Sequence, residues 1–230
     1  MESDDMITIV GCGPGGRDYL TQVAVQAVRA SSVVLGSERL FALFPEYKGQ
    51  RVVIGAHVQE ALDTIFRELE VGPVTVLVSG DPGLCSLAKP IVARLGPTRC
   101  RVIPGISSVQ VAFARLGLDW LDAVFLTAHG RNLRVSPEEC RRFEKIAILA
   151  GGTESWPQIV GFVKQMEAQG GRRDVYVCEN LTLPDERVRR VGTDEIVSGN
   201  WASRSLVLLV RTDDSQPLCL DESNKEKNPI

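Results

Sequence analysis

The chain has 230 residues, of which 44% are hydrophobic and 24% charged, and it carries a formal net charge of −3 from 26 Lys and Arg against 29 Asp and Glu. This length and apolar content suffice for a buried core in one large α/β domain or two smaller ones. The near balance of charge argues against a nucleic-acid partner, because nucleic acids usually select a clearly basic surface.

Membrane, export and metal signals are missing from the sequence. No apolar run reaches the roughly 18–20 residues that span a bilayer, and the acidic start at residues 1–5 lacks the basic region of a signal peptide. Six cysteines stand apart without a Cys-x-x-Cys pair, and His57 and His129 lie far from any pair of cysteines. We therefore expect a cytoplasmic protein with free thiols, no membrane association and no bound metal.

The first half of the chain alternates short β-branched runs with helical patterns. A helix is expected from about Thr21, and apolar side chains recur at helical spacing over residues 58–69 and 84–95. This alternation predicts a mainly parallel sheet covered by helices on both faces. The expected strands are residues 6–10, 33–35, 52–54, 74–79 and 101–103.

The rhythm pauses at residues 117–122, and a second series of strands and helices follows. A helix is predicted over 154–169 and an edge strand over 187–192. The other expected strands are residues 123–128, 146–150, 175–178 and 206–210. We therefore predict two α/β domains, 1–119 and 120–212, and a disordered tail over 213–230, whose polar composition cannot bury much surface.

A glycine-rich loop, Gly11-Cys12-Gly13-Pro14-Gly15-Gly16, follows the first strand and matches the G-x-G-x-x-G pattern of dinucleotide-binding proteins. Glu38 stands about where an acidic ribose ligand would be sought. Two details argue against this reading: Pro14 has no N–H to donate, and the helix begins too late to place its N-terminus behind the glycines. A nucleotide-dependent oxidoreductase stays an alternative, as does a turn that serves packing alone.

Three further strand ends are rich in turn-forming and small polar residues: 79–83, 104–108 and 129–131. Ligands of parallel α/β sheets gather at the carboxyl ends of the strands, so we expect these loops to share a pocket. Each loop has a simpler interpretation as a turn. Asp81 would then cap a helix starting near Leu84, and Ser107 would cap the helix that runs to Leu116.

The sequences Val10–Gly15, Ser79–Gly83 and Pro104–Ser108 together resemble the tetrapyrrole methylases. Thr127–Arg131 and Glu179–Thr182 resemble, within that family, the CbiE branch, which includes the C-5 methyltransferases of precorrin-6Y and cobalt-precorrin-7. The resemblance runs over residues 6–211. It implies a two-domain fold with a mixed or mainly parallel sheet in each domain, and S-adenosylmethionine bound in the cleft between the domains. The implied function is C-5 methylation of a corrin precursor in cobalamin biosynthesis.

The resemblance also implies a set of cofactor contacts and partners. S-adenosylmethionine, and its product S-adenosylhomocysteine, would be held by Pro14, Ser79, Gly80, Asp81, Leu84, Ser107, Ser108, Ala150 and Leu181. The last two would contact the adenosine from the second domain. The substrate would be a corrinoid and the assembly a homodimer. Many members of the branch carry a fused domain for C-15 methylation and decarboxylation, so we expect that activity to be absent here or supplied by a separate protein.

Transfer of a methyl group from a sulfonium depends mainly on positioning, with an acid or base to relocate a proton afterwards. We expect His129 to supply that acid or base, because its unperturbed pKa lies near neutrality. The alternative is a structural histidine that fixes the turn. Arg131 and Arg134, and less directly Arg39 or Arg115, are expected to hold the carboxylates of the acceptor. Two other functions stay open: a family relative with a different acceptor, and a protein that carries a tetrapyrrole without methylating it.

Overall fold

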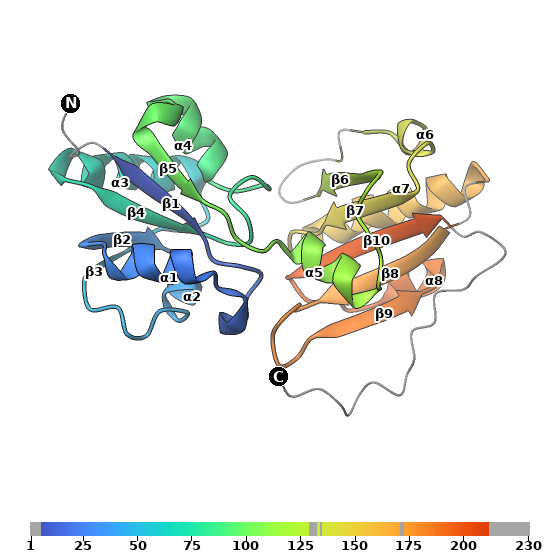
Figure 1. Ribbon diagram of the computed structural model, residues 1–230. Coiled ribbons are helices and arrows are strands. Elements are labelled where there is room, and N and C mark those ends of the chain that lie inside the picture. Colours follow the sequence, from blue (N-terminus) through green and yellow to red (C-terminus); the bar gives the residue numbers. More distant parts are fainter. Residues whose placement is uncertain (1–5, 129–132, 134, 171–172, 212–230) are drawn as a thin grey trace. The chain divides into compact units, whose positions relative to one another are not determined.

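The computed structural model describes residues 6–128, 133, 135–170 and 173–211 (Figure 1). The contacts between Cα atoms divide the chain into two compact units, each built on one five-stranded sheet. The first unit contains the residues up to Val111 together with Asn180–Glu186, and the second contains Ala112–Glu179 and the residues from Arg187 on. The change of unit falls inside helix α5 (Ser108–Arg115), whereas the sequence places it between residues 119 and 120, in the segment that follows this helix.

The sheet of the first unit is parallel throughout, with the order β3-β2-β4-β1-β5. Its strands are β1 (Ile7–Gly11), β2 (Val33–Gly36), β3 (Gln50–Val53), β4 (Val74–Val78) and β5 (Cys100–Ile103). The central strands β1 and β4 are apolar except for Thr8 and Thr75, as expected where helices cover both sides of the sheet. All five predicted strands are confirmed, although the third begins at Gln50 rather than Val52.

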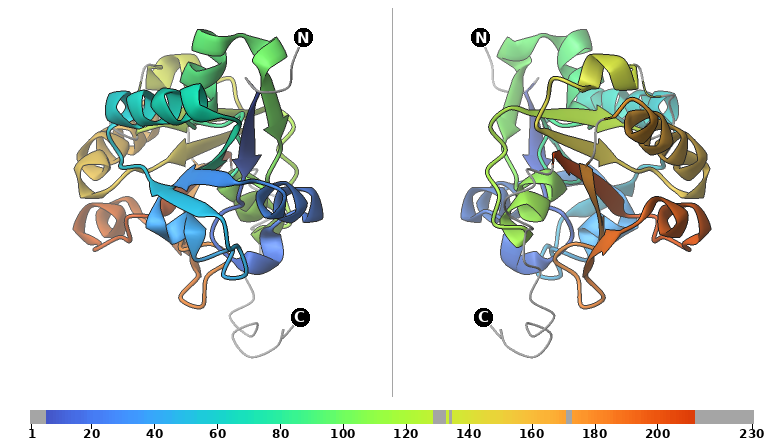
Figure 2. Two further views of the ribbon diagram at one scale, coloured as in Figure 1. Left: turned by 90° about the vertical axis from the view of Figure 1, so that its left-hand side faces the viewer. Right: turned by 90° about the vertical axis from the view of Figure 1, so that its right-hand side faces the viewer.

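Helices cover both faces of this sheet, as the alternation predicts (Figures 1 and 2). One face packs on α3 (Val58–Val71) and α4 (Ala88–Leu95). The other packs on α1 (Gln22–Arg29) and α2 (Glu38–Phe41). The side-chain oxygen of Thr21 accepts a hydrogen bond from Ala24 N–H at 3.2 Å, which caps α1 at the expected residue.

The predicted start of α4 near Leu84 is wrong, because the helix begins only at Ala88. The preceding residues satisfy their hydrogen bonds in tight polar turns instead. Leu84 N–H donates to the carbonyl of Asp81 at 3.1 Å, and the hydroxyl of Ser86 accepts from Ala88 N–H at 3.0 Å. Such local bonds compete with helix formation and keep residues 81–87 in a loop.

The sheet of the second unit is mixed, with the order β6-β7-β10-β8-β9. Its strands are β6 (Ala123–Thr127), β7 (Lys145–Leu149), β8 (Arg173–Glu179), β9 (Arg187–Val191) and β10 (Ser205–Arg211). Only β6 and β7 run parallel, and β9 lies at an edge, as predicted. The flanking helices are α6 (Pro137–Cys140), α7 (Trp156–Ala168) and α8 (Thr193–Ser198).

The long helix predicted over 154–169 is confirmed as α7, which a single 3₁₀ turn (Thr153–Ser155) precedes. A proline in the first turn of α7 is tolerated because its missing N–H would have no partner within the helix. The five cysteines in the described ranges are free, as expected. None of the helices in these ranges is both long and apolar enough to cross a bilayer.

Candidate functional site

Three of the predicted loops lie at the carboxyl ends of neighbouring strands. The sheet order places β4, β1 and β5 side by side, and the loops 11–16, 79–83 and 104–108 follow these strands. Because the strands are parallel, the loops leave the sheet at the same edge. The first unit therefore brings these three segments together.

Backbone bonds tie the first two loops to each other. Gly80 N–H donates to the carbonyl of Gly13 at 2.8 Å, Gly13 N–H donates to the carbonyl of Gly80 at 3.3 Å, and Cys12 N–H donates to the carbonyl of Val78 at 2.9 Å. Gly13 and Gly80 have φ angles of 73° and 65°, which favour glycine. The pairing of the two loops therefore depends on backbone angles that glycine adopts without strain.

Gly105 brings the third loop against the other two. A Cβ atom at this position would lie 2.4 Å from the carbonyl oxygen of Gly80 and 2.7 Å from the carbonyl carbon of Gly11. A Cβ on Gly11 would in turn lie 2.6 Å from the backbone nitrogen of Gly105. Backbone atoms cannot withdraw as a flexible side chain can, so only glycine fits at both positions.

The carboxylate of Asp81 joins the second and third loops. Its Oδ1 accepts from Gly83 N–H at 2.7 Å, and its Oδ2 accepts from Gly105 N–H at 3.1 Å. The alternative in which Asp81 caps a helix near Leu84 is therefore wrong. An ionised carboxylate has about four lone-pair sites, so both oxygens keep the capacity to accept a further bond from a ligand.

The two predicted serines of the third loop begin α5. Ser107 Oγ accepts from Gln110 N–H at 3.1 Å, and Gln110 Oε1 accepts from Ser107 N–H at 2.8 Å. This reciprocal pair confirms the interpretation of Ser107 as a helix cap. Ser108 is the first residue of the helix and is half-buried. In the second loop, the Oγ of Ser79 accepts from Arg39 Nη2 at 3.3 Å.

The geometry after the glycine loop does not match a dinucleotide site. A 3₁₀ turn (Arg17–Tyr19) follows the loop, and α1 begins only at Gln22. Among the residues that the structure describes, no α-helix N-terminus therefore stands directly behind the glycines, where a pyrophosphate would need one. The thiol of Cys12 points into the core, and burial raises its pKa to about 12. We therefore treat Cys12 as a packing residue.

The hairpin loop between β8 and β9, Asn180–Glu186, groups with the first unit although both its strands belong to the second. The hydroxyl of Thr182 accepts from Gly16 N–H at 2.7 Å, and the side chain of Leu183 would lie 3.1 Å from a Cβ on Gly15. This loop contains Leu181, one of the predicted cofactor contacts. The sequence singles out Glu179–Thr182 as a motif, but the bond between Thr182 and Gly16 spans 166 positions, and no local pattern could have indicated it.

Glu179 precedes this hairpin loop and is fully buried. Its Oε1 accepts from Ala202 N–H at 2.9 Å, and its Oε2 lies 3.3 Å from Arg189 Nη2 and 3.6 Å from Arg187 Nε. A buried carboxylate needs such partners, because an unpaired charge in the core would be strongly destabilising. The base of the hairpin in the second unit is thus held by an ion-paired network.

The remaining predicted site residues lie in the second unit, in other parts of the loops, or outside the residues that the structure describes. Ala150 follows β7 in the second unit, and its N–H donates to the carbonyl of Ser205 at 3.0 Å. Leu84 is half-buried in the loop before α4, and Pro14 is half-buried in the glycine loop. His129, Arg131 and Arg134 lie outside the described residues.

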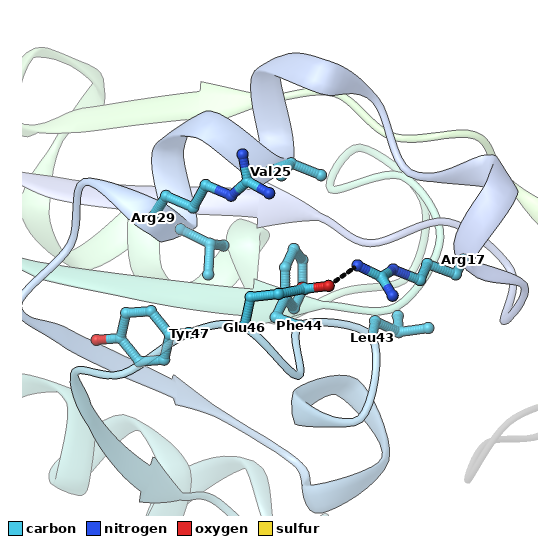
Figure 3. Close-up of a pocket in the computed structure, with 8 residues that line it drawn as sticks. Arg17, Val25, Arg29, Leu43, Phe44, Glu46 and Tyr47 are labelled. Atoms are coloured by element: carbon cyan, nitrogen blue, oxygen red, sulfur yellow. Dashed lines mark hydrogen bonds and ion pairs between the residues drawn. The ribbon is translucent and has the colours of Figure 1, made fainter.

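Two hollows in the described ranges have linings that contain no residue of the three loops. The first lies between α1 and residues 43–47, and its lining includes Arg17 and Glu46, which form an ion pair of 2.5 Å (Figure 3). Its volume of about 20 Å³ suffices for about one water molecule. The second is an open hollow of about 350 Å³ beside β8 and β9, where Asp174 pairs with Arg190. The candidate site is therefore defined by the loops at the strand ends and not by either hollow.

An α/β protein with a parallel sheet and glycine-rich loops at neighbouring strand ends belongs to the class that binds small molecules at that edge. Residues 6–197 match the family model of Tetrapyrrole (Corrin/Porphyrin) Methylases. The chain is a member of this family.

Individual relatives agree with the assignment. A cobalt-precorrin-7 C(5)-methyltransferase of Salmonella typhimurium is 32% identical over 89% of this chain and 98% of its own. Among solved structures, the precorrin-6Y methylase CbiE of Archaeoglobus fulgidus is similar with a TM-score of 0.69 at 25% identity, over 91% of this chain and 99% of its own. A uroporphyrin-III C-methyl transferase of Thermus thermophilus, solved with S-adenosylhomocysteine, shares the fold with a TM-score of 0.73 at 22% identity, over 89% of this chain and 97% of its own.

Proposed function

We propose that this chain is an S-adenosylmethionine-dependent methyltransferase that methylates C-5 of cobalt-precorrin-7 or precorrin-6Y in cobalamin biosynthesis. The observation that carries the proposal is the meeting of three glycine-containing loops at the ends of β4, β1 and β5. The match along almost the whole Salmonella typhimurium C(5)-methyltransferase narrows the reaction to this position of the ring.

The residues present suit a cofactor that combines a nucleoside with an amino acid. The glycines at 13, 80 and 105 let the three loops pack against one another, and the serines and Asp81 add directed hydrogen-bonding groups. We assign the cofactor to Pro14, Ser79, Gly80, Asp81, Leu84, Ser107 and Ser108 in the first unit, with Leu181 and Ala150 as further contacts. When bound, S-adenosylmethionine would supply a methyl group from its sulfonium. The rest of the cofactor would leave as a neutral thioether, S-adenosylhomocysteine.

The work of the protein in this reaction is positioning. The three loops are cross-linked by their own backbone and by Asp81, so a ligand meets a surface that needs little rearrangement. Such fixed geometry lowers the barrier, because the entropy of alignment is lost on binding and not in the reaction itself. Acceptor binding and proton relocation belong in this proposal to Arg131 and Arg134, and to His129, respectively.

The test is incubation of the protein with cobalt-precorrin-7 or precorrin-6Y and isotopically labelled S-adenosylmethionine, followed by mass spectrometry of the corrinoid. We expect one labelled methyl group per ring, at C-5, and no loss of carbon dioxide. Binding of S-adenosylhomocysteine together with a corrinoid, without any transfer, would instead indicate a carrier. Methyl transfer only to another tetrapyrrole would show that the protein acts on a different acceptor. A rise of Tm with NAD or FAD, but not with S-adenosylhomocysteine, would favour an oxidoreductase. A homodimer is part of the proposal, and sedimentation at micromolar concentration tests it.

A further inference from the structure

The end of the glycine loop is held by a segment far away in the sequence. The amide of Gly16 donates to Thr182 Oγ1 at 2.7 Å, and a Cβ on Gly16 would lie 2.5 Å from the carbonyl oxygen of Thr182. Gly15, one position earlier, would bring a Cβ to within 3.1 Å of the side chain of Leu183. The last two residues of the loop thus face the hairpin loop Asn180–Glu186 at van der Waals distance.

Thr182 is itself held in an uncommon backbone conformation. Its φ of 70° lies in the left-handed region, which β-branched residues rarely adopt. Within the hairpin loop, Thr182 N–H donates to Glu186 Oε2 at 2.6 Å, and Asn180 Nδ2 donates to Asp185 Oδ2 at 2.7 Å. A strained residue persists only where its surroundings determine it, and such residues gather at functional sites.

We propose that Thr182 is a positioning residue for the cofactor: its hydroxyl holds the N–H of Gly16 and thereby fixes the loop Gly11–Gly16 in the conformation that receives S-adenosylmethionine. This inference rests on the proposed function. Leu181 is assigned above to the cofactor itself, so one hairpin loop supplies both a direct contact and the restraint on the loop opposite. Without the hydroxyl, the half-buried amide of Gly16 loses its acceptor. An unpaired buried N–H is unfavourable, so the loop Gly11–Gly16 would shift to expose this amide to water.

The test compares Thr182→Val, which keeps the branched shape and removes the acceptor, with Thr182→Ser, which keeps the hydroxyl. We expect the valine variant to bind S-adenosylhomocysteine about tenfold more weakly in calorimetry, since an unpaired buried donor is costly. The KM for S-adenosylmethionine should rise by a similar factor while kcat stays within about twofold. The serine variant should bind within about twofold of the wild type. Thr193→Val is the matched control, because it removes a hydroxyl that makes a different hydrogen bond, donated to Glu167, in the second unit. The affinity of this variant for S-adenosylhomocysteine should not change.

A valine variant that binds as tightly as the wild type would overturn the inference, and so would a serine variant as weak as the valine variant. If the wild type itself binds no S-adenosylhomocysteine, the proposed function fails first. A measurement on the wild type keeps the inference testable if the valine variant does not fold. The amide of Gly16 should exchange slowly with solvent, and S-adenosylhomocysteine should slow it at least tenfold further. Exchange that the ligand leaves unchanged would contradict the assignment.

Discussion

Gly105→Ala is the substitution that addresses the meeting of the three loops most directly. The new Cβ would lie 2.4 Å from the carbonyl oxygen of Gly80 and 2.7 Å from the carbonyl carbon of Gly11. Ordinary contacts of this kind are about 3.5 Å, so the overlap is about 1 Å and falls on backbone atoms of two strand ends. The loops must separate to accommodate the methyl group.

Overpacking of this kind costs about 1–3 kcal/mol of the free energy of unfolding. At about 2–4 °C per kcal/mol for a chain of this size, a loss of about 2 kcal/mol lowers Tm by about 4–8 °C. Because the separation occurs at the proposed cofactor site, we expect the affinity for S-adenosylhomocysteine to fall more than tenfold. Differential scanning calorimetry and isothermal titration calorimetry measure the two effects.

Gly55→Ala is the matched control, because a Cβ at this exposed position would meet nothing within 4 Å. It should leave both Tm and affinity unchanged. A Gly105→Ala protein with wild-type Tm and affinity would show that the loops are not packed as described. A lower Tm with unchanged affinity would show that the packing of the loops does not determine cofactor binding.

Three other predictions follow from the same site. Asp81→Asn replaces one of the two acceptor oxygens by an N–H donor, so we expect S-adenosylhomocysteine binding to weaken about tenfold with a loss of Tm of only a few degrees; unchanged affinity would remove Asp81 from the site. Burial raises the pKa of Cys12 to about 12, so at pH 8 only roughly one thiol in ten thousand is ionised. After treatment with a thiol reagent, mass spectrometry should find the exposed Cys85 labelled and Cys12 unlabelled. Rapid labelling of Cys12 would contradict its burial. Arg131→Ala should raise the KM for the corrinoid more than the KM for S-adenosylmethionine in steady-state kinetics, and equal increases would exclude an acceptor clamp.

The sequence predicts most of the fold because the strands carry strong local signals. Every predicted strand is present, since largely apolar runs such as Val74–Val78 have a single stable place between two layers of helices. The start of α4 is missed because its apolar pattern extends over Leu84, while the hydrogen bonds that keep residues 81–87 in turns come from polar neighbours. Periodicity records burial and does not record such competing bonds.

The site is predicted in part. The three loops are recognisable by their turn residues, and the parallel order of β4, β1 and β5 explains why they meet. Asp81 joins the second loop to the third through a bond to Gly105, which lies 24 positions along the chain. The bond from Gly16 to Thr182 spans 166 positions. Spacing along the chain gives no access to contacts of that kind, and only the folded backbone places the partners together.

The central claim is that the loops at the ends of β4, β1 and β5 bind S-adenosylmethionine. The most direct test is a crystal structure of the protein with S-adenosylhomocysteine. We expect the ligand within hydrogen-bonding distance of residues in 79–83 and 104–108 and in contact with Pro14. Ligand density found only at another part of the chain, with no ligand in contact with these three loops, would contradict the account.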